Sequence, residues 1–131
     1  MDHDDNGLNS QYVVSLSVDG GATFQTETMT SSIVGAEACD CCQPEIIVND
    51  EYVIVYFRNN DNNIRDIKGV ISFDRGVTFS TWFSVDDHLW NINACPSTGP
   101  DSRFLDANTS VTTYKTTFNG SAQIYVNEYK F

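Results

Sequence analysis

The chain has 131 residues, of which 12% are aromatic, and carries a formal net charge of −11 at pH 7. This charge argues against nucleic acids and anionic membranes as partners, because both would repel it. The length suits one domain with a real core, and no apolar run approaches the ~20 residues that a membrane-spanning helix needs.

The first ten residues form an acidic segment without the features of a signal peptide. Residues 2–7 match D-x-D-x-N-G, the first half of a calcium loop, with Asp2, Asp4 and Asn6 at ligand positions. Val13 stands where such a loop carries its last glutamate. We therefore expect a disordered terminus and no cofactor, with calcium at these residues as the alternative.

A repeated motif organises the chain. The pattern S-x-D-x-G-x-T-F occurs twice, 55 residues apart, between stretches of strand-forming residues. The aspartate can accept N–H bonds within a tight turn, the glycine supplies a positive φ, and the phenylalanine is expected to enter the core. We interpret both copies as structural hairpin turns, formed by Ser17, Asp19, Gly21, Thr23 and Phe24, and by Ser72, Asp74, Gly76, Thr78 and Phe79.

The first copy joins a strand expected over Gln11–Ser17 to one running from Phe24 towards Val34, and a loop follows over Gly35–Cys42. Four strands are then expected at Glu45–Val48, Glu51–Phe57, Asp66–Ser72 and Thr78–Val85. Asn49-Asp50 is predicted to be a two-residue turn, and Arg58–Arg65 a polar loop. The runs EIIV and YVIVYF are almost continuously apolar, which predicts strands covered on both faces.

After a long loop over Asp86–Thr98, three further strands are predicted at Arg103–Leu105, Ser110–Phe118 and Ala122–Tyr129. Asn119-Gly120 is typical of a type I′ hairpin turn. The chain would thus be all-β, with a half unit at residues 11–34, a complete four-stranded unit at 43–85 and an incomplete one at 99–131. A four-stranded unit of this length is typical of a β-propeller blade.

The four cysteines are unevenly placed, with Cys39, Cys41 and Cys42 together and Cys95 far away. The C-x-C-C spacing does not easily wrap one tetrahedral metal ion, so disulfides are favoured and no metal site is expected. Disulfides indicate the periplasm or the outside of the cell. Loops of consecutive blades lie side by side, so we expect Cys95 to pair with Cys41 or Cys42, preferably Cys42. A second bond would then join Cys39 to the remaining cysteine.

The order of motifs is similar to that of an exported bacterial family of sialidase-like, Asp-box β-propellers. The elements are C-x-C-C-x-P at Cys39–Pro44, Y-x-R at Tyr56–Arg58, I-R-D-I at Ile64–Ile67, the second Asp-box, and W-x-I-x-A-C-P-x-x-G-P at Trp90–Pro100. The resemblance spans residues 11–130. It implies a six-bladed propeller in the whole protein, with any glycan site on the face opposite the Asp-boxes.

Three loops are expected to converge on that face, where Arg58, Arg65, Asp66, Asp40 and Trp90 are the ligand-binding candidates. Sialidases hold a sugar carboxylate with three arginines and use an acid and a Tyr/Glu pair, which is why arginines matter here. Arg103 is the third candidate arginine, and Asp61 and Asp101 are further acids. The alternatives are an Arg65–Asp66 ion pair and a Trp90 packed between blades. No Phe/Tyr-Arg-Ile-Pro element is present, so catalytic residues are not assigned.

The expected function is therefore that of part of a sialidase-like propeller that binds or processes glycans. The alternatives are a non-catalytic propeller for protein contacts and a structural remnant without activity. Fewer than three blades cannot close a ring. We therefore expect the chain to be an excerpt of a longer one, or to self-associate and cover its open sheet faces.

Overall fold

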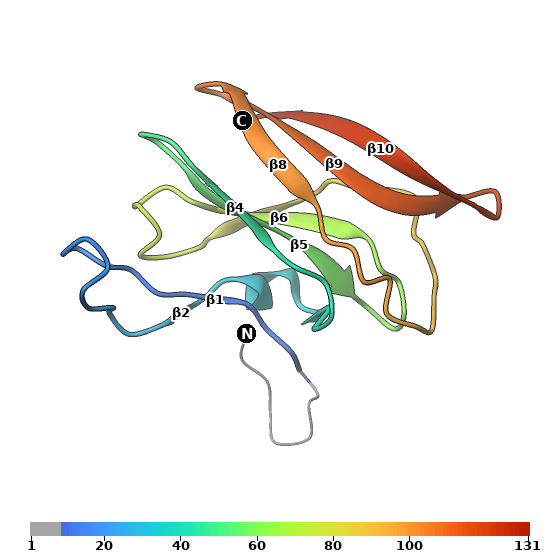
Figure 1. Ribbon diagram of the computed structural model, residues 1–131, viewed down its shortest axis with the longest axis horizontal. Helices are drawn as coiled ribbons and strands as arrows, with labels where there is room; N and C mark the ends of the chain where they lie inside the picture. Colours follow the sequence, from blue (N-terminus) through green and yellow to red (C-terminus); the bar gives the residue numbers. More distant parts are fainter. Residues whose placement is uncertain (1–8) are drawn as a thin grey trace.

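Antiparallel strands supply nearly all regular structure of residues 9–131, which are the residues described by the computed structural model (Figure 1). The calcium alternative at residues 2–7 lies outside them. No helix of these residues is long and apolar enough to span a membrane. The elements are β1 (Val13–Val14), β2 (Thr28–Met29), the 3₁₀ helix η1 (Ser31–Val34), β3 (Glu37–Ala38), β4 (Glu45–Val48), β5 (Val53–Asn60), β6 (Ile67–Ser72), β7 (Thr81–Ser84), β8 (Asp101–Asp106), β9 (Thr109–Phe118) and β10 (Ser121–Lys130).

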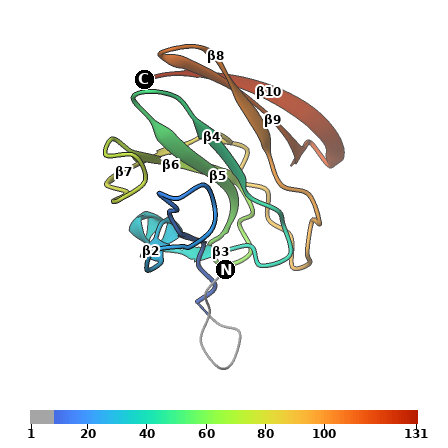
Figure 2. The same ribbon diagram turned by 60° about the vertical axis from the view of Figure 1, so that its left-hand side comes forward.

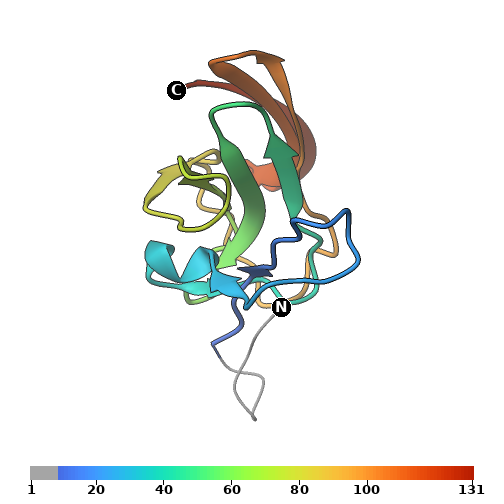
Figure 3. The same cartoon turned by 90° about the vertical axis from the view of Figure 1, so that its left-hand side faces the viewer.

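The strands form three separate sheets, none of which closes on itself. Strands β1 and β2 make a two-stranded ladder, and β8, β9 and β10 make a three-stranded meander. Between them lies the central sheet, in which β4, β5, β6 and β7 pair in sequence and β3 pairs with the far end of β5. Figures 1, 2 and 3 show this central sheet as a middle layer, with β8–β10 on one side and β1, β2 and η1 on the other.

The core consists of two apolar clusters, one on each face of the central sheet. Ile54, Tyr56 and Phe83 face the β8–β10 sheet and pack with Tyr114. Val55, Phe57 and Val70 face the opposite way and pack with Tyr12 and Val14 near β1. Every residue of β5 from Val53 to Asn59 is buried. The YVIVYF run is therefore covered on both faces, as its composition predicted.

The two Asp-box turns have the same hydrogen bonds. In the second, the amide of Gly76 donates to Ser72 Oγ (2.7 Å), while the amide and hydroxyl of Thr78 donate to Asp74 (2.8 and 2.6 Å). The first repeats these bonds at 2.8, 2.9 and 2.6 Å. Gly21 and Gly76 have φ values of 90° and 86°, which a β-branched residue would resist. The expectation of matching tight turns is confirmed.

These hydrogen bonds have an electrostatic consequence. The threonine hydroxyl, the threonine amide and the serine hydroxyl all donate to an ionised carboxylate. They thereby lower the pKa of both Asp19 and Asp74 to about 2. The carboxylates of both aspartates are thus engaged in the hydrogen bonds of their own turns, which agrees with a structural role.

The first unit is less regular than its sequence predicts. The strand expected to reach Val34 ends at Met29, and the 3₁₀ helix η1 follows. Ser31 turns inward there, because its hydroxyl accepts the hydrogen bond of the Tyr12 amide (2.8 Å), which in a regular ladder would go to a backbone carbonyl of the paired strand. Phe24 does not enter the core but is 66% exposed, since no described sheet covers that side of β1 and β2. Its counterpart Phe79 packs against the second cluster.

Three details of the central sheet also differ from expectation. The EIIV run is covered on one face only: Ile47 is buried, but Ile46 is 49% exposed because β1 lies beside that side of β4 without covering it. The turn after β4 spans four residues, because Asn49 Oδ1 accepts the amides of Glu51 and Tyr52 (2.9 and 2.8 Å). The polar loop expected to begin at Arg58 begins later, because strand β5 continues to Asn60. The pairing of β3 with this end of β5 keeps it in the sheet.

Candidate functional site

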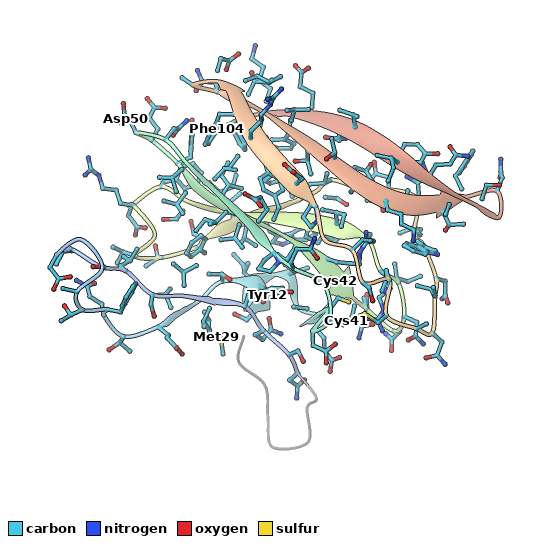
Figure 4. All side chains as sticks on the ribbon, in the orientation of Figure 1. Tyr12, Met29, Cys41, Cys42, Asp50 and Phe104 are labelled. Carbon is cyan, nitrogen blue, oxygen red and sulfur yellow. A yellow bond between two sulfur atoms is a disulfide. The ribbon has the colours of Figure 1, made fainter. Side chains whose placement is uncertain are left out.

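Three loops meet at one end of the central sheet, opposite the Asp-box turn between β6 and β7. Cys41 precedes β4, Cys95 lies in the loop between β7 and β8, and a disulfide joins the two (Cα–Cα 6.2 Å; Figure 4 labels Cys41). The expectation that Cys95 bonds to the cysteine cluster is confirmed. The preference for Cys42 is wrong, because Cys42 is buried beneath this surface and Cys41 is exposed.

The other two cysteines are free thiols in the interior. Cys39 Sγ lies 3.0 Å from Cys42 Sγ and 3.4 Å from Cys41 Sγ. The second disulfide expected for Cys39 is therefore not formed. A hydrogen bond from Cys42 and the nearby Arg65 lower the pKa of the Cys39 thiol to about 6, while donation to Cys39 and burial raise the pKa of Cys42.

Arg65 belongs to this cluster. Its Nη1 donates to Cys39 Sγ (3.3 Å), and its backbone amide donates to the carbonyl of Trp90 (2.8 Å). The polar loop after β5 is thus tied to both the cysteine loop and the loop before β8. The predicted convergence of the three loops is confirmed by these contacts and by the disulfide.

Arg58 has a different position from the one expected of a ligand-binding residue. Its side chain is fully buried, and its guanidinium donates to the backbone carbonyls of Thr98 (2.9 Å), Lys115 (2.7 Å) and Arg65. These carbonyls come from three separate segments. Trp90 stacks over the guanidinium, 5.4 Å from ring centroid to Cζ. Arg58 is therefore an interior clamp, and in this structure it is not accessible to a ligand.

The remaining candidates are spread over the surface and interior. The carboxylate of Asp66 is buried and pairs with Lys68 Nζ (2.7 Å), so it orients neither arginine, and no Arg65–Asp66 ion pair forms. Trp90 is half-buried over Arg58 and Lys115, and Asp40 is exposed beside the cysteines. Arg103 is exposed on β8, in a different sheet from Arg58. The expected arginine triad is therefore not assembled in the described residues.

Tyr12 is a positioning residue that the sequence did not reveal. Its buried hydroxyl donates to the carbonyl of Cys39 (3.0 Å) and contacts that of Cys42 (Figure 4). Its ring packs 5.7 Å from that of Phe57. Burial raises the pKa of this phenol. Tyr12 thus holds the cysteine loop from the neighbouring ladder, although nothing in the local pattern around it distinguishes it from an ordinary core residue.

A polar hollow of about 410 Å³ lies at the same end of the central sheet. It is bordered by the loop after β5 and by the segment that links η1 to β3. Most of the lining side chains are amides and carboxylates, and none of the described lining residues is a lysine, an arginine or an aromatic. The amides and carboxylates include Gln11, Glu37, Asn60, Asp61, Asn62 and Asn63. The sequence signal is the asparagine-rich run at 59–63, which by itself indicates only a polar loop.

The hollow is held in shape by its own hydrogen bonds. Glu37 accepts the amide of Asn9 (2.8 Å) and the side chain of Asn60 (3.3 Å). Asn62 and Asn63 have φ values of 49° and 70°, the left-handed region that asparagine tolerates better than most residues. This backbone turns the loop back over the end of β5. The side chains of Asp61 and Asn62 are exposed at the rim.

Comparisons with protein-family models, with curated proteins and with solved structures return no match for this chain.

Proposed function

We propose that this chain is part of a sialidase-like β-propeller and that its polar hollow binds a glycan. The observation that carries this proposal is the chemistry of the hollow, whose amide and carboxylate side chains at one end of a rigid sheet suit sugar hydroxyls. Its position adds support. The loop between β5 and β6 and the Asp-box turn between β6 and β7 lie at opposite ends of β6, as expected for a propeller's ligand face.

The lining also defines the class of glycan. Glu37 and Asp61 bring negative charge to the hollow, and the net charge of the chain is −11. A sialic acid carboxylate would be repelled there, and Arg58 is buried away from solvent. We therefore expect a neutral or amino sugar rather than a sialoside. The proposed activity is binding of such a glycan.

A glycan array probed with the labelled protein tests this proposal. We expect retention of neutral or amino-sugar glycans and no retention of sialylated ones. Asn62→Gly removes a rim amide but keeps the left-handed backbone, and Asp61→Ala removes a rim carboxylate. Losing one hydrogen bond of about 0.5–1.5 kcal/mol should weaken binding roughly 2–10-fold.

Asn119→Gly is the matched control. Asn119 also has a left-handed backbone (φ 51°) but lies in the turn between β9 and β10, away from the hollow. This variant should bind glycans as the wild type does. Binding that is absent, or that is insensitive to both rim variants, would refute the proposed site.

Protein contact is a second candidate function, favoured by the outer face of the β8–β10 sheet. Ile124 and Val126 are exposed there beside Arg103. Exposed apolar residues of this kind, together with an unpaired strand edge, favour association. Light scattering tests this candidate. The measured mass of the wild type should rise with protein concentration, and it should be lower in an Ile124→Thr/Val126→Thr variant.

A further inference from the structure

The four cysteine sulfurs lie close enough together to form one coordination shell. The Sγ atoms of Cys39, Cys41, Cys42 and Cys95 are all within 4.8 Å of one another. In a tetrahedral site with Zn–S bonds of about 2.3 Å, neighbouring sulfurs are about 3.8 Å apart. The distances from Cys39 Sγ to the sulfurs of Cys42 and Cys41, 3.0 and 3.4 Å, are somewhat shorter than this. Small side-chain rotations would therefore bring the sulfurs to the spacing of a tetrahedral site.

Polar groups surround these sulfurs as they surround metal-bound thiolates. Arg65 Nη1 donates to Cys39 Sγ, and the amide of Ser97 donates to Cys95 Sγ, both at 3.3 Å. The hydroxyl of Ser97 is equally close to Cys95 Sγ. Neutral sulfur is a weak acceptor, whereas a metal-bound thiolate accepts such bonds well and is oriented by them. The donors come from two different loops, as do the sulfurs.

The charges around the cluster match a metal site. One divalent ion and four thiolates carry a net charge of −2, which is costly to bury unless it is balanced. Arg65 contacts Cys39, and the guanidinium of Arg58 lies within electrostatic range of Cys42, Asp86 and Cys39. Within residues 9–131 neither arginine forms an ion pair with a carboxylate, since the ion pairs there join Lys68 to Asp66 and His88 to Asp86. Two cations are thus placed beside the sulfurs.

We propose that these four cysteines bind one soft divalent cation such as Zn²⁺ when the Cys41–Cys95 bond is reduced. The reduction consumes two electrons and two protons from a thiol reductant, whose two thiols become a disulfide. Metal binding then releases to water the thiol protons that the four cysteines still carry. The disulfide and the metal are alternative states of one cluster, each of which links the loop before β4 to the loop before β8. Oxidising surroundings favour the former, and reducing surroundings the latter.

Cobalt titration of the reduced protein tests this inference. The full chain is reduced with a phosphine under nitrogen, desalted and titrated with Co²⁺. We expect one Co²⁺ per chain, the visible bands of tetrahedral cobalt and a sulfur-to-cobalt charge-transfer band, all displaced by Zn²⁺. The unreduced protein should show none of these bands. Carboxylates bind Co²⁺ without the charge-transfer band, so the acidic surface cannot imitate the result.

Substitutions distinguish the cysteines that would bind the metal ion from residues that only lie near it. Cys39→Ser and Cys42→Ser should each weaken Co²⁺ binding by at least about 100-fold, and Arg65→Ala, which removes a donor to sulfur, by roughly 10–100-fold. Asp50→Asn removes an exposed carboxylate in the turn between β4 and β5, at the end of β4 away from the cysteines, and should leave affinity and spectrum unchanged. A folded, reduced chain without the tetrahedral bands would overturn the inference. If reduction unfolds the chain, Zn²⁺ must restore its circular dichroism at one ion per chain, and failure to do so overturns the inference equally.

Discussion

Replacing Arg58 by alanine is expected to destabilise the protein strongly. The guanidinium donates to three backbone carbonyls and is shielded by Trp90. A hydrogen bond to a charged group contributes about 1.5–3 kcal/mol. Water that enters the cavity would recover part of this for the freed carbonyls. We therefore expect a net loss of about 3–5 kcal/mol, which is less than the sum of the three bonds because of this recovery.

The assay is urea unfolding followed by tryptophan fluorescence, with the disulfide intact. For a domain of this size the loss corresponds to a fall in Tm of roughly 10–20 °C. Arg58→Lys keeps the charge but not the planar fork, so its stability should lie between those of the wild type and Arg58→Ala. Arg103→Ala is the control, because Arg103 is exposed on β8, and it should stay within about 0.5 kcal/mol of the wild type. An Arg58→Ala variant as stable as this control would refute the clamp.

Three further predictions concern the scaffold. Cys95→Ser opens a loop closed over 54 residues by the bond to Cys41 and should cost about 4 kcal/mol in chemical unfolding. The folded pKa of Asp74 is about 2 against an ordinary 3.8, so its contribution is complete above pH 3.8 and disappears as the pH falls through 2. The stability gap between wild type and Asp74→Asn should therefore narrow over this range in urea titrations, and a constant gap would contradict the assigned role. Gly69→Ala places a methyl 2.4 Å from the ring of Phe83 and should cost about 1–3 kcal/mol, which Phe83→Leu should partly restore in a double-mutant cycle.

Local patterns in the sequence predicted the central part of the fold well. The S-x-D-x-G-x-T-F motif encodes all of its own hydrogen bonds, so both turns could be placed without any tertiary knowledge. The strand at Glu45–Val48 and the hairpin turn at Asn119-Gly120 were likewise set by their own residues. The shortened first unit was not predictable, because the inward turn of Ser31 depends on Tyr12, 19 residues away.

The sequence predicted where the candidate site lies but not the roles of its residues. Chain topology brought the three loops together, but it could not assign roles within them. Whether Arg58 faces a ligand or three carbonyls depends on contacts with Thr98 and Lys115, which are distant in sequence. The choice of Cys41 over Cys42 depends on which sulfur faces the surface. The chain turns at these residues, where the amide of Cys42 donates to the carbonyl of Cys39, and this turn leaves Cys41 exposed and Cys42 buried. The polar hollow needs the pairing of β3 with β5, and a two-residue strand leaves no pattern of its own.

The most direct test of glycan binding at the hollow is an amide chemical-shift titration by NMR. The ¹⁵N-labelled chain is titrated with the best-retained neutral or amino-sugar glycan from the array. We expect saturable shifts at residues 9–11, 35–37 and 60–63, and none at the Asp-box turns at the opposite end of the sheet. Saturable shifts confined to the outer face of β8–β10 or to the Asp-box turns, or no shifts at all, would contradict the proposal that the hollow is a glycan site.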